Sequence, residues 1–173
     1  ENGKSAAVGA AKILATLKEG RLDEESTANF PIVQAGSGAT NVVCDHAVIN
    51  GEARSRDAQK LSDYIQYFEE HCRKTAEEFG VRAETSWKKG TPGFSVPHDS
   101  ASVRLISEVF RQMGVTPCPE PSGGGMDANR FNMNGLQSVG LATAYFDNHT
   151  SNEHVLLDEF LRTGEMVCLT ILE

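Results

Sequence analysis

The chain has 173 residues, of which 39% are hydrophobic and 23% charged, enough apolar sequence for a packed core. Its 16 lysines and arginines against 24 aspartates and glutamates give a net charge of −8, which excludes nucleic acid as an expected partner because phosphates would be repelled. No apolar run approaches the length of a membrane span, and no signal-peptide pattern opens the chain. We therefore expect a cytoplasmic protein that does not bind membranes.

The first half predicts a layered unit that begins with a helix and two strands. Residues 4–19 form the expected helix, with Gly20 as its end signal. Residues 29–36 and 39–55 then alternate apolar and polar residues as half-buried strands do, and GSGA provides a plausible hairpin connection. The expected inner side of the helix carries Val8, Ala11 and Ala15.

A second helix and a third strand complete the predicted order α-β-β-α-β. The helix spans residues 57–79 and ends at Gly80, and residues 81–89 alternate again as a strand. A split βαβ sandwich of the ferredoxin type has a further strand before its first helix. We therefore expect this sheet to lack a member and the chain to be a piece of a longer protein. The apolar face of the second helix consists of Leu61, Ile65, Phe68, Cys72, Ala76 and Phe79.

The second half begins with a turn-rich connector over residues 90–98. Asp99 or Ser100 is the expected N-cap of a helix that ends at Gly114. This helix turns Val103, Ile106, Val109 and Phe110 inward.

The remaining elements are a glycine loop, a short helix, one strand and a final helix. Asp127 is the expected cap of the short helix that begins near Ala128, and residues 136–145 form the strand. One strand is too few for a sheet, so we expect its partners to lie outside this chain. The final helix carries a predicted buried face of Phe160, Leu161, Gly164, Val167, Cys168 and Ile171.

The four cysteines are far apart and form no CxxC pair. We expect free thiols, with two disulfides as the alternative. No cysteine has the spacing of a metal ligand. The residues are Cys44, Cys72, Cys118 and Cys168.

Two stretches carry candidate site residues. Gly123, Gly124 and Gly125 let backbone N–H groups approach a carboxylate or a developing oxyanion, although a tight turn that needs positive φ explains three glycines equally well. His149 follows a predicted strand, where an imidazole is a suitable zinc ligand, and Glu153 is placed to orient it; the alternative is a surface histidine. One histidine cannot hold a metal, so any metal site must be completed elsewhere.

Five motifs together resemble the C-terminal half of the peptidase T-like branch of the co-catalytic zinc peptidases. They are ENGKSA, GATNVVCD, GEARSRD, PSGGGMDAN and NHTSNEH, and they run in register over essentially the whole chain. That family also contains aminoacylase, carboxypeptidase G and succinyl-diaminopimelate desuccinylase. The resemblance implies an α/β chain in which residues 1–91 are an incomplete ferredoxin-like lid and dimerisation domain. Residues 92–173 would be the last segment of a zinc-dependent catalytic domain.

Individual residues fall on functional positions of that family. The resemblance implies that His149 is a zinc ligand, that Asn41 helps to hold the substrate, and that Gly123, Gly124 and Gly125 line the substrate pocket. Peptidase T has an arginine near the position of Gly123, which puts a strict tripeptide specificity in doubt. The other ligands of two zinc ions, or of other divalent metals, and the glutamate general base would lie upstream. The fragment alone would therefore be inactive.

The function expected from the resemblance is metal-assisted hydrolysis of short peptides by a homodimer paired through its lid domains. One alternative is hydrolysis of N-acyl amino acids, as in aminoacylase. A second alternative is a non-catalytic dimeric module that binds a regulatory ligand. Such a module has no need of the GGGMDAN and NHTSNEH motifs in this order.

Overall fold

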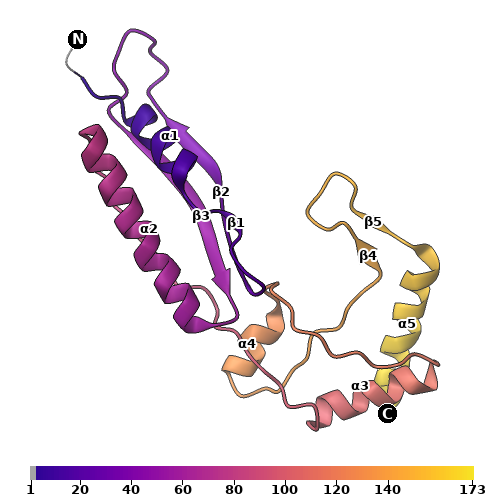
Figure 1. The fold of residues 1–173 in the computed structure, drawn as a ribbon. Coiled ribbons are helices and arrows are strands. Elements are labelled where there is room, and N and C mark those ends of the chain that lie inside the picture. Colours follow the sequence, from indigo (N-terminus) through magenta and orange to yellow (C-terminus); the bar gives the residue numbers. More distant parts are fainter. Residues whose placement is uncertain (1–2) are drawn as a thin grey trace. The chain divides into compact units, whose positions relative to one another are not determined.

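The computed structural model describes residues 3–173, which separate between Lys89 and Gly90 into two compact units (Figure 1). Helices and small antiparallel sheets make up the chain, which confirms the α/β class expected from the sequence. No helix in the described part of the chain is long and apolar enough to cross a bilayer.

In the first unit, two helices pack against each other and against a three-stranded antiparallel sheet of order β1-β2-β3 (Figure 1). The second helix begins where the sequence predicts, because the Asp57 carboxylate accepts hydrogen bonds from the N–H groups of Gln59 and Lys60. It ends at Gly80, whose φ of 86° suits glycine. The elements are α1 (Ala6–Thr16), β1 (Gly20–Arg21), β2 (Ser26–Ala35), β3 (Ala47–Ser55) and α2 (Ala58–Phe79).

The core of the first unit lies between β2 and the helices. The first five residues of β2 alternate, with Ser26, Ala28 and Phe30 buried and the residues between them exposed. The ring of Phe30 stacks on Phe68 of α2 with centroids 5.0 Å apart. Leu17, just after α1, joins the same cluster. The predicted apolar face of α2 therefore packs as expected.

A β-bulge interrupts the pairing of β2 with β3. Phe30 and Pro31 of β2 both face Gly51 of β3, so one strand has an extra residue. Proline suits this position because it has no N–H group to donate to the ladder. A Cβ atom on Gly51 would overlap the carbonyl oxygen of Asn29 and lie 2.8 Å from the Cα of Phe30. The close approach of the two backbones therefore requires glycine here.

Helix α1 differs from its prediction in length and in orientation. It ends at Thr16 rather than near Gly20, which lies in β1. Tyr64 Oη donates to the Lys18 carbonyl at 2.6 Å, so α2 supplies a partner for a polar group that follows the helix. Helix α1 is apolar on most sides, so periodicity alone does not select the face that packs. The buried residues are Gly9, Ala10 and Ile13, whereas Val8, Ala11 and Ala15 are exposed.

The strand predicted for residues 81–89 does not form. Within the described residues this segment pairs with no strand, and a strand requires a neighbour for its backbone hydrogen bonds. Side chains hold it to α2 instead. The Trp87 ring meets Phe68 edge-on at 5.1 Å, and its Nε1 donates to Glu69 Oε1 at 3.0 Å.

The second unit has a small core between two helices. Of the two caps that the sequence predicts, Asp99 and Ser100, it is Ser100 that caps the first of them, by accepting a hydrogen bond from the N–H group of Val103 at 3.4 Å. Val109 is completely buried against Ile106 and Met166. The elements are α3 (Ala101–Gln112), α4 (Asp127–Met133), β4 (Tyr145–Phe146), β5 (His154–Val155) and α5 (Leu157–Leu172).

Three predictions for the second unit are wrong. Residues 136–145 form no strand apart from Tyr145, because no described strand lies beside them to pair with. The N-cap of α4 is Met126, and Asp127 is the first residue of the helix. The predicted buried face of α5 is mostly open, since only Met166 of this helix is buried. The exposed apolar residues of α5 include Leu157, Phe160, Leu161, Val167, Ile171 and Leu172.

Candidate functional site

His149 lies in the turn that joins the two short strands β4 and β5. These strands pair antiparallel, with Tyr145 opposite Val155 and Phe146 opposite His154. The turn is exposed throughout. His149 is therefore at the surface of its unit and directly beyond a strand end, where a side chain can reach a ligand.

The backbone of this turn is held in an unusual conformation. Asp147 and His149 have φ values of 54° and 67°, the only non-glycine residues with positive φ in the described part of the chain. Each such residue costs about 1–2 kcal/mol. Thr150 Oγ1 donates to the Asp147 carbonyl at 2.7 Å, and the N–H group of His149 donates to Glu153 Oε2 at 2.8 Å. These bonds stabilise a strained turn of the kind often found at functional sites.

Glu153 thus contacts the backbone of His149 and not its imidazole. The carboxylate fixes the peptide that carries the ring, which is a different way of orienting the histidine from the ring contact that the sequence suggests. His154 is already engaged: its Nδ1 lies 2.9 Å from the Asn152 carbonyl oxygen and its ring stacks on Phe146 at 5.5 Å. Of the two histidines, His149 is the one whose ring has no bonded partner among the described residues.

The glycine loop does not need its glycines for backbone conformation. Gly123, Gly124 and Gly125 are absent from the positive-φ glycines of the described residues, so the tight-turn explanation loses its support. A Cβ atom on Gly123 or Gly125 would meet nothing within 4 Å, and one on Gly124 would meet only Ser122 Oγ at 3.5 Å. The loop is exposed and leaves open space at three successive residues.

Asn41 belongs to the first unit, whereas the other candidate residues belong to the second. It lies in the exposed connection between β2 and β3, which is longer than the predicted GSGA hairpin. The N–H group of Ala6 donates to the Cys44 carbonyl at 2.8 Å, so the base of this connection is attached to the start of α1. Asn41 itself is free to contact a ligand from the surface.

The described residues contain no complete metal site. No group of three or more His, Cys, Asp or Glu side chains within residues 3–173 is arranged to hold a metal ion. His149 offers one imidazole, and zinc usually takes four ligands. The donor type fits a metal, but one imidazole alone is too few ligands for a zinc site.

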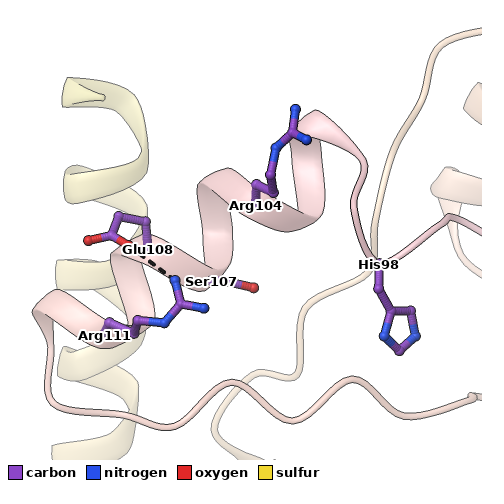
Figure 2. Close-up of a pocket in the computed structure, with 5 residues that line it drawn as sticks. All are labelled: His98, Arg104, Ser107, Glu108 and Arg111. Atoms are coloured by element: carbon purple, nitrogen blue, oxygen red, sulfur yellow. Dashed lines mark hydrogen bonds and ion pairs between the residues drawn. The ribbon is translucent and has the colours of Figure 1, made fainter.

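A shallow hollow on the second unit contains none of the predicted site residues. It is lined by His98 and four residues of α3 (Figure 2). Arg111 is paired with Glu108 at 3.1 Å, and Figure 2 shows the Arg104 guanidinium pointing away from Arg111. The charged groups that line the hollow do not converge on one point, so they are not arranged to bind a ligand.

Helix α4 contains polar residues that the sequence reasoning did not single out. Asn129 contacts the glycine loop and the connector, and Asn132 exchanges hydrogen bonds with the backbone of Ser138, donating to its carbonyl at 2.8 Å and accepting from its N–H at 3.1 Å. The available signal was the sequence DANRFNMN, because asparagine is a poor helix former and two in one short helix, with a third directly after it, need an explanation.

Comparison with known proteins relates both units to peptidases. The peptidase dimerisation domain family M20_dimer matches residues 1–80. The crystal structure of aminopeptidase PepT from Bacillus cereus is 36% identical over 98% of this chain and 45% of its own, with a TM-score of 0.75. A tripeptidase from Staphylococcus aureus is 33% identical over 98% of this chain and 45% of its own, with a TM-score of 0.83.

A more distant structure has the same fold. It is YxeP of Bacillus subtilis, described as a dinuclear metal binding peptidase of the M20 family. It is 20% identical over 97% of this chain and 46% of its own, with a TM-score of 0.65. The chain thus spans about half the length of each of these relatives.

Proposed function

We propose that the chain is part of a metal-dependent peptidase of the M20 family that hydrolyses short peptides. Residues 1–91 would be its lid and dimerisation domain, and residues 92–173 the last segment of its catalytic domain. The observation that carries the proposal is the 36% identity to an aminopeptidase over 98% of the chain. A match restricted to the dimerisation domain would support only an assembly module, whereas this match includes the second unit.

His149 would supply one imidazole to the metal centre of the complete enzyme. Three features support this role: its exposed position beyond β4, its ring without a bonded partner, and the strained turn held by Glu153. The resemblance implies two zinc ions, and the description of YxeP as a dinuclear metal binding peptidase is consistent with a pair of metals. When bound, such a metal pair lowers the pKa of a water molecule and polarises the scissile carbonyl group.

The substrate would be held by residues of both units. The open space at Gly123, Gly124 and Gly125 lets a substrate backbone approach the N–H groups of the loop closely. Asn41 would contribute an amide from the first unit, commonly to the active site of the partner subunit in such enzymes. A homodimer paired through the first unit would provide that geometry, and the match of residues 1–80 to a dimerisation domain supports it.

The test is the substitution His149→Ala in the full-length enzyme. Removing a metal ligand should reduce kcat/KM for a dipeptide or tripeptide by at least about a hundredfold, since even residues that only orient a ligand are worth 10–100-fold. Bound metal per subunit should fall, while the dimer remains intact by sedimentation. His154→Ala is the matched control, because this neighbouring imidazole is engaged with Asn152 and Phe146. Wild-type turnover and metal content in His149→Ala would refute the assignment.

Hydrolysis of N-acyl amino acids is the second candidate. Gly123 keeps it open, because peptidase T has an arginine near this position and a glycine supplies no guanidinium that would restrict the enzyme to tripeptides. The two activities differ in what they require on the amino side of the scissile bond. A panel of free dipeptides and tripeptides, their N-acetylated forms and N-acetyl amino acids, assayed with zinc, separates them. A peptidase that requires a free amino terminus should lose activity on acetylation, whereas an aminoacylase should hydrolyse the N-acetyl amino acids.

A further inference from the structure

Asn129 connects two segments of the second unit that are far apart in sequence. Its Oδ1 accepts a hydrogen bond from the N–H group of Met126 at 2.9 Å, and its Nδ2 donates to the carbonyl oxygen of Pro92 at 3.0 Å. Met126 is the residue directly after Gly125, and Pro92 lies in the connector over residues 90–98. One side chain therefore joins the connector to the end of the glycine loop.

The two bonds determine the orientation of the amide. The oxygen must face an N–H donor and the nitrogen must face a carbonyl, so a flipped amide would lose both bonds. The N–H group of Asn129 also donates to the Met126 carbonyl at 3.0 Å. Met126 and Asn129 are therefore bonded in both directions, by a backbone bond and by the side-chain bond from the third helix position that forms one half of a capping box.

The choice of asparagine is informative because capping alone does not require it. An aspartate at this helix position would accept the same hydrogen bond from Met126 and would interact favourably with the helix dipole. Only the bond to Pro92 needs the amide nitrogen, since a carboxylate cannot donate to a carbonyl oxygen. The amide nitrogen of Asn129 thus bonds the connector, and its amide oxygen bonds the residue that follows the glycine loop.

We propose that Asn129 is a positioning residue that transmits the position of the connector to the glycine loop. The second unit begins at Gly90, so a displacement of the chain entering this unit reaches Pro92 after two residues. Through Asn129 it reaches the peptide between Gly125 and Met126. That the glycine loop contacts a substrate rests on the proposed function. The connection between the connector and the loop rests only on the two hydrogen bonds of the Asn129 side chain.

The test compares Asn129→Asp with Asn129→Ala in the 173-residue chain by NMR. The 13C′ shift of Pro92, observed through the Gly93 amide, reports the connector bond, and amide exchange of Met126 reports the loop bond. In both variants the 13C′ chemical shift of Pro92 should move toward the value of a carbonyl group that accepts no hydrogen bond from Asn129 Nδ2. Met126 exchange should accelerate about fivefold in the alanine variant, the worth of one hydrogen bond, and should stay unchanged or slow in the aspartate variant.

Asn134→Asp is the matched control. It adds the same charge just after the same helix, where Asn134 Nδ2 donates to the Arg130 carbonyl at 2.8 Å, and it should change neither readout. General loosening of the second unit would instead accelerate Met126 exchange in Asn129→Asp and Asn129→Ala alike, and that result would overturn the proposal. An unchanged Pro92 carbonyl in both variants would also overturn it, because the connector bond would then not exist.

Transmission is tested by adding Pro92→Gly, which loosens the connector but keeps its carbonyl group. In the natural background this change should accelerate Met126 exchange about twofold or more, the lower range of coupling between contacting residues. In the Asn129→Asp background it should have no effect, because the connector is already disconnected. Equal acceleration in both backgrounds would refute the link. These readouts require no enzymatic activity, so they remain decisive even if the proposed peptidase function fails.

Discussion

The two units differ in how far they bury their large apolar side chains. Phe30 of the first unit is 8% exposed, whereas Phe160 of the second is 59% exposed although it lies on the apolar side of an amphipathic helix. Most of the large hydrophobic residues that the structure exposes belong to the second unit. Contiguous exposed apolar surface usually marks a place where other protein packs. The first unit therefore buries its large apolar residues in a core of its own, and the second leaves most of its own exposed.

The difference follows from what each unit can pair with. In the first unit, β2 and β3 share a long ladder and two helices cover β3. In the second, the two strands are two residues long and the apolar segment 136–144 has no strand beside it in the described residues. A sheet is the usual platform on which helices bury an apolar face. Without one, α5 buries only the residue that meets α3.

The largest difference in stability is expected between alanine substitutions of Phe30, in the first unit, and Phe160, in the second. Phe30→Ala should lower the free energy of unfolding of the first unit by about 3–4 kcal/mol, because it removes a buried ring that stacks on Phe68. Phe160→Ala should change the unfolding free energy by less than about 0.5 kcal/mol. Urea titration followed by fluorescence of Trp87, which contacts Phe68, measures the first change; far-UV circular dichroism measures the second. Equal losses would show that α5 is covered.

The β-bulge gives the next largest effect. Gly51→Ala should cost roughly 3 kcal/mol, the upper end for an overpacked site, because the new Cβ atom meets the backbone of β2. Gly123→Ala is the matched change in the second unit, where a Cβ atom would meet nothing within 4 Å, and it should be nearly neutral for stability. Thermal unfolding of both variants checks the pair. A neutral Gly51→Ala would mean that the bulge relaxes easily.

Alkaline pH should weaken the first unit selectively. Burial raises the pKa of the Cys72 thiol from 9.0 to about 11. A thiol with a higher pKa in the folded state contributes its full stabilisation below pH 9, and this is lost as pH rises toward 11, by about 2 kcal/mol at most. Burial also raises the pKa of Tyr64 to about 12, which extends the loss to higher pH. Urea midpoints of the natural chain and of Cys72→Ala should be measured between pH 8 and 11. The difference between the two midpoints should shrink as pH rises only if ionisation of Cys72 causes the loss of stability.

The smallest effect concerns the open face of α5. Gly164 lies within this helix, and a Cβ atom there would meet nothing within 4 Å. Gly164→Ala should therefore stabilise the helix by roughly 0.5–1 kcal/mol in this chain, the difference in helix propensity. In the proposed full-length protein the same substitution should be neutral or harmful if covering protein approaches Gly164 closely. Helicity by circular dichroism in the chain, and thermal stability of the full-length protein, test the two halves of this prediction.

The sequence by itself determined the helices α2 and α3. Apolar spacing and the glycine end signals place them within one or two residues, because helix hydrogen bonds and caps are local, whereas the end of α1 and the cap of α4 are predicted wrongly. The family resemblance, carried by motifs spread along the whole chain, was confirmed by the comparisons. It also directed attention to His149, whose strained turn no periodicity could predict.

Tertiary structure decided the strands, the packing faces and the role of Asn129. Residues 81–89 and 136–145 have sequence patterns compatible with strands, yet a strand exists only when a neighbour accepts its backbone hydrogen bonds. The face predicted to be buried on α5 is exposed, because burial depends on what lies opposite and nothing in the described residues covers most of it. Asn129 meets Pro92 across 37 positions of sequence, a contact that only the folded chain can bring together.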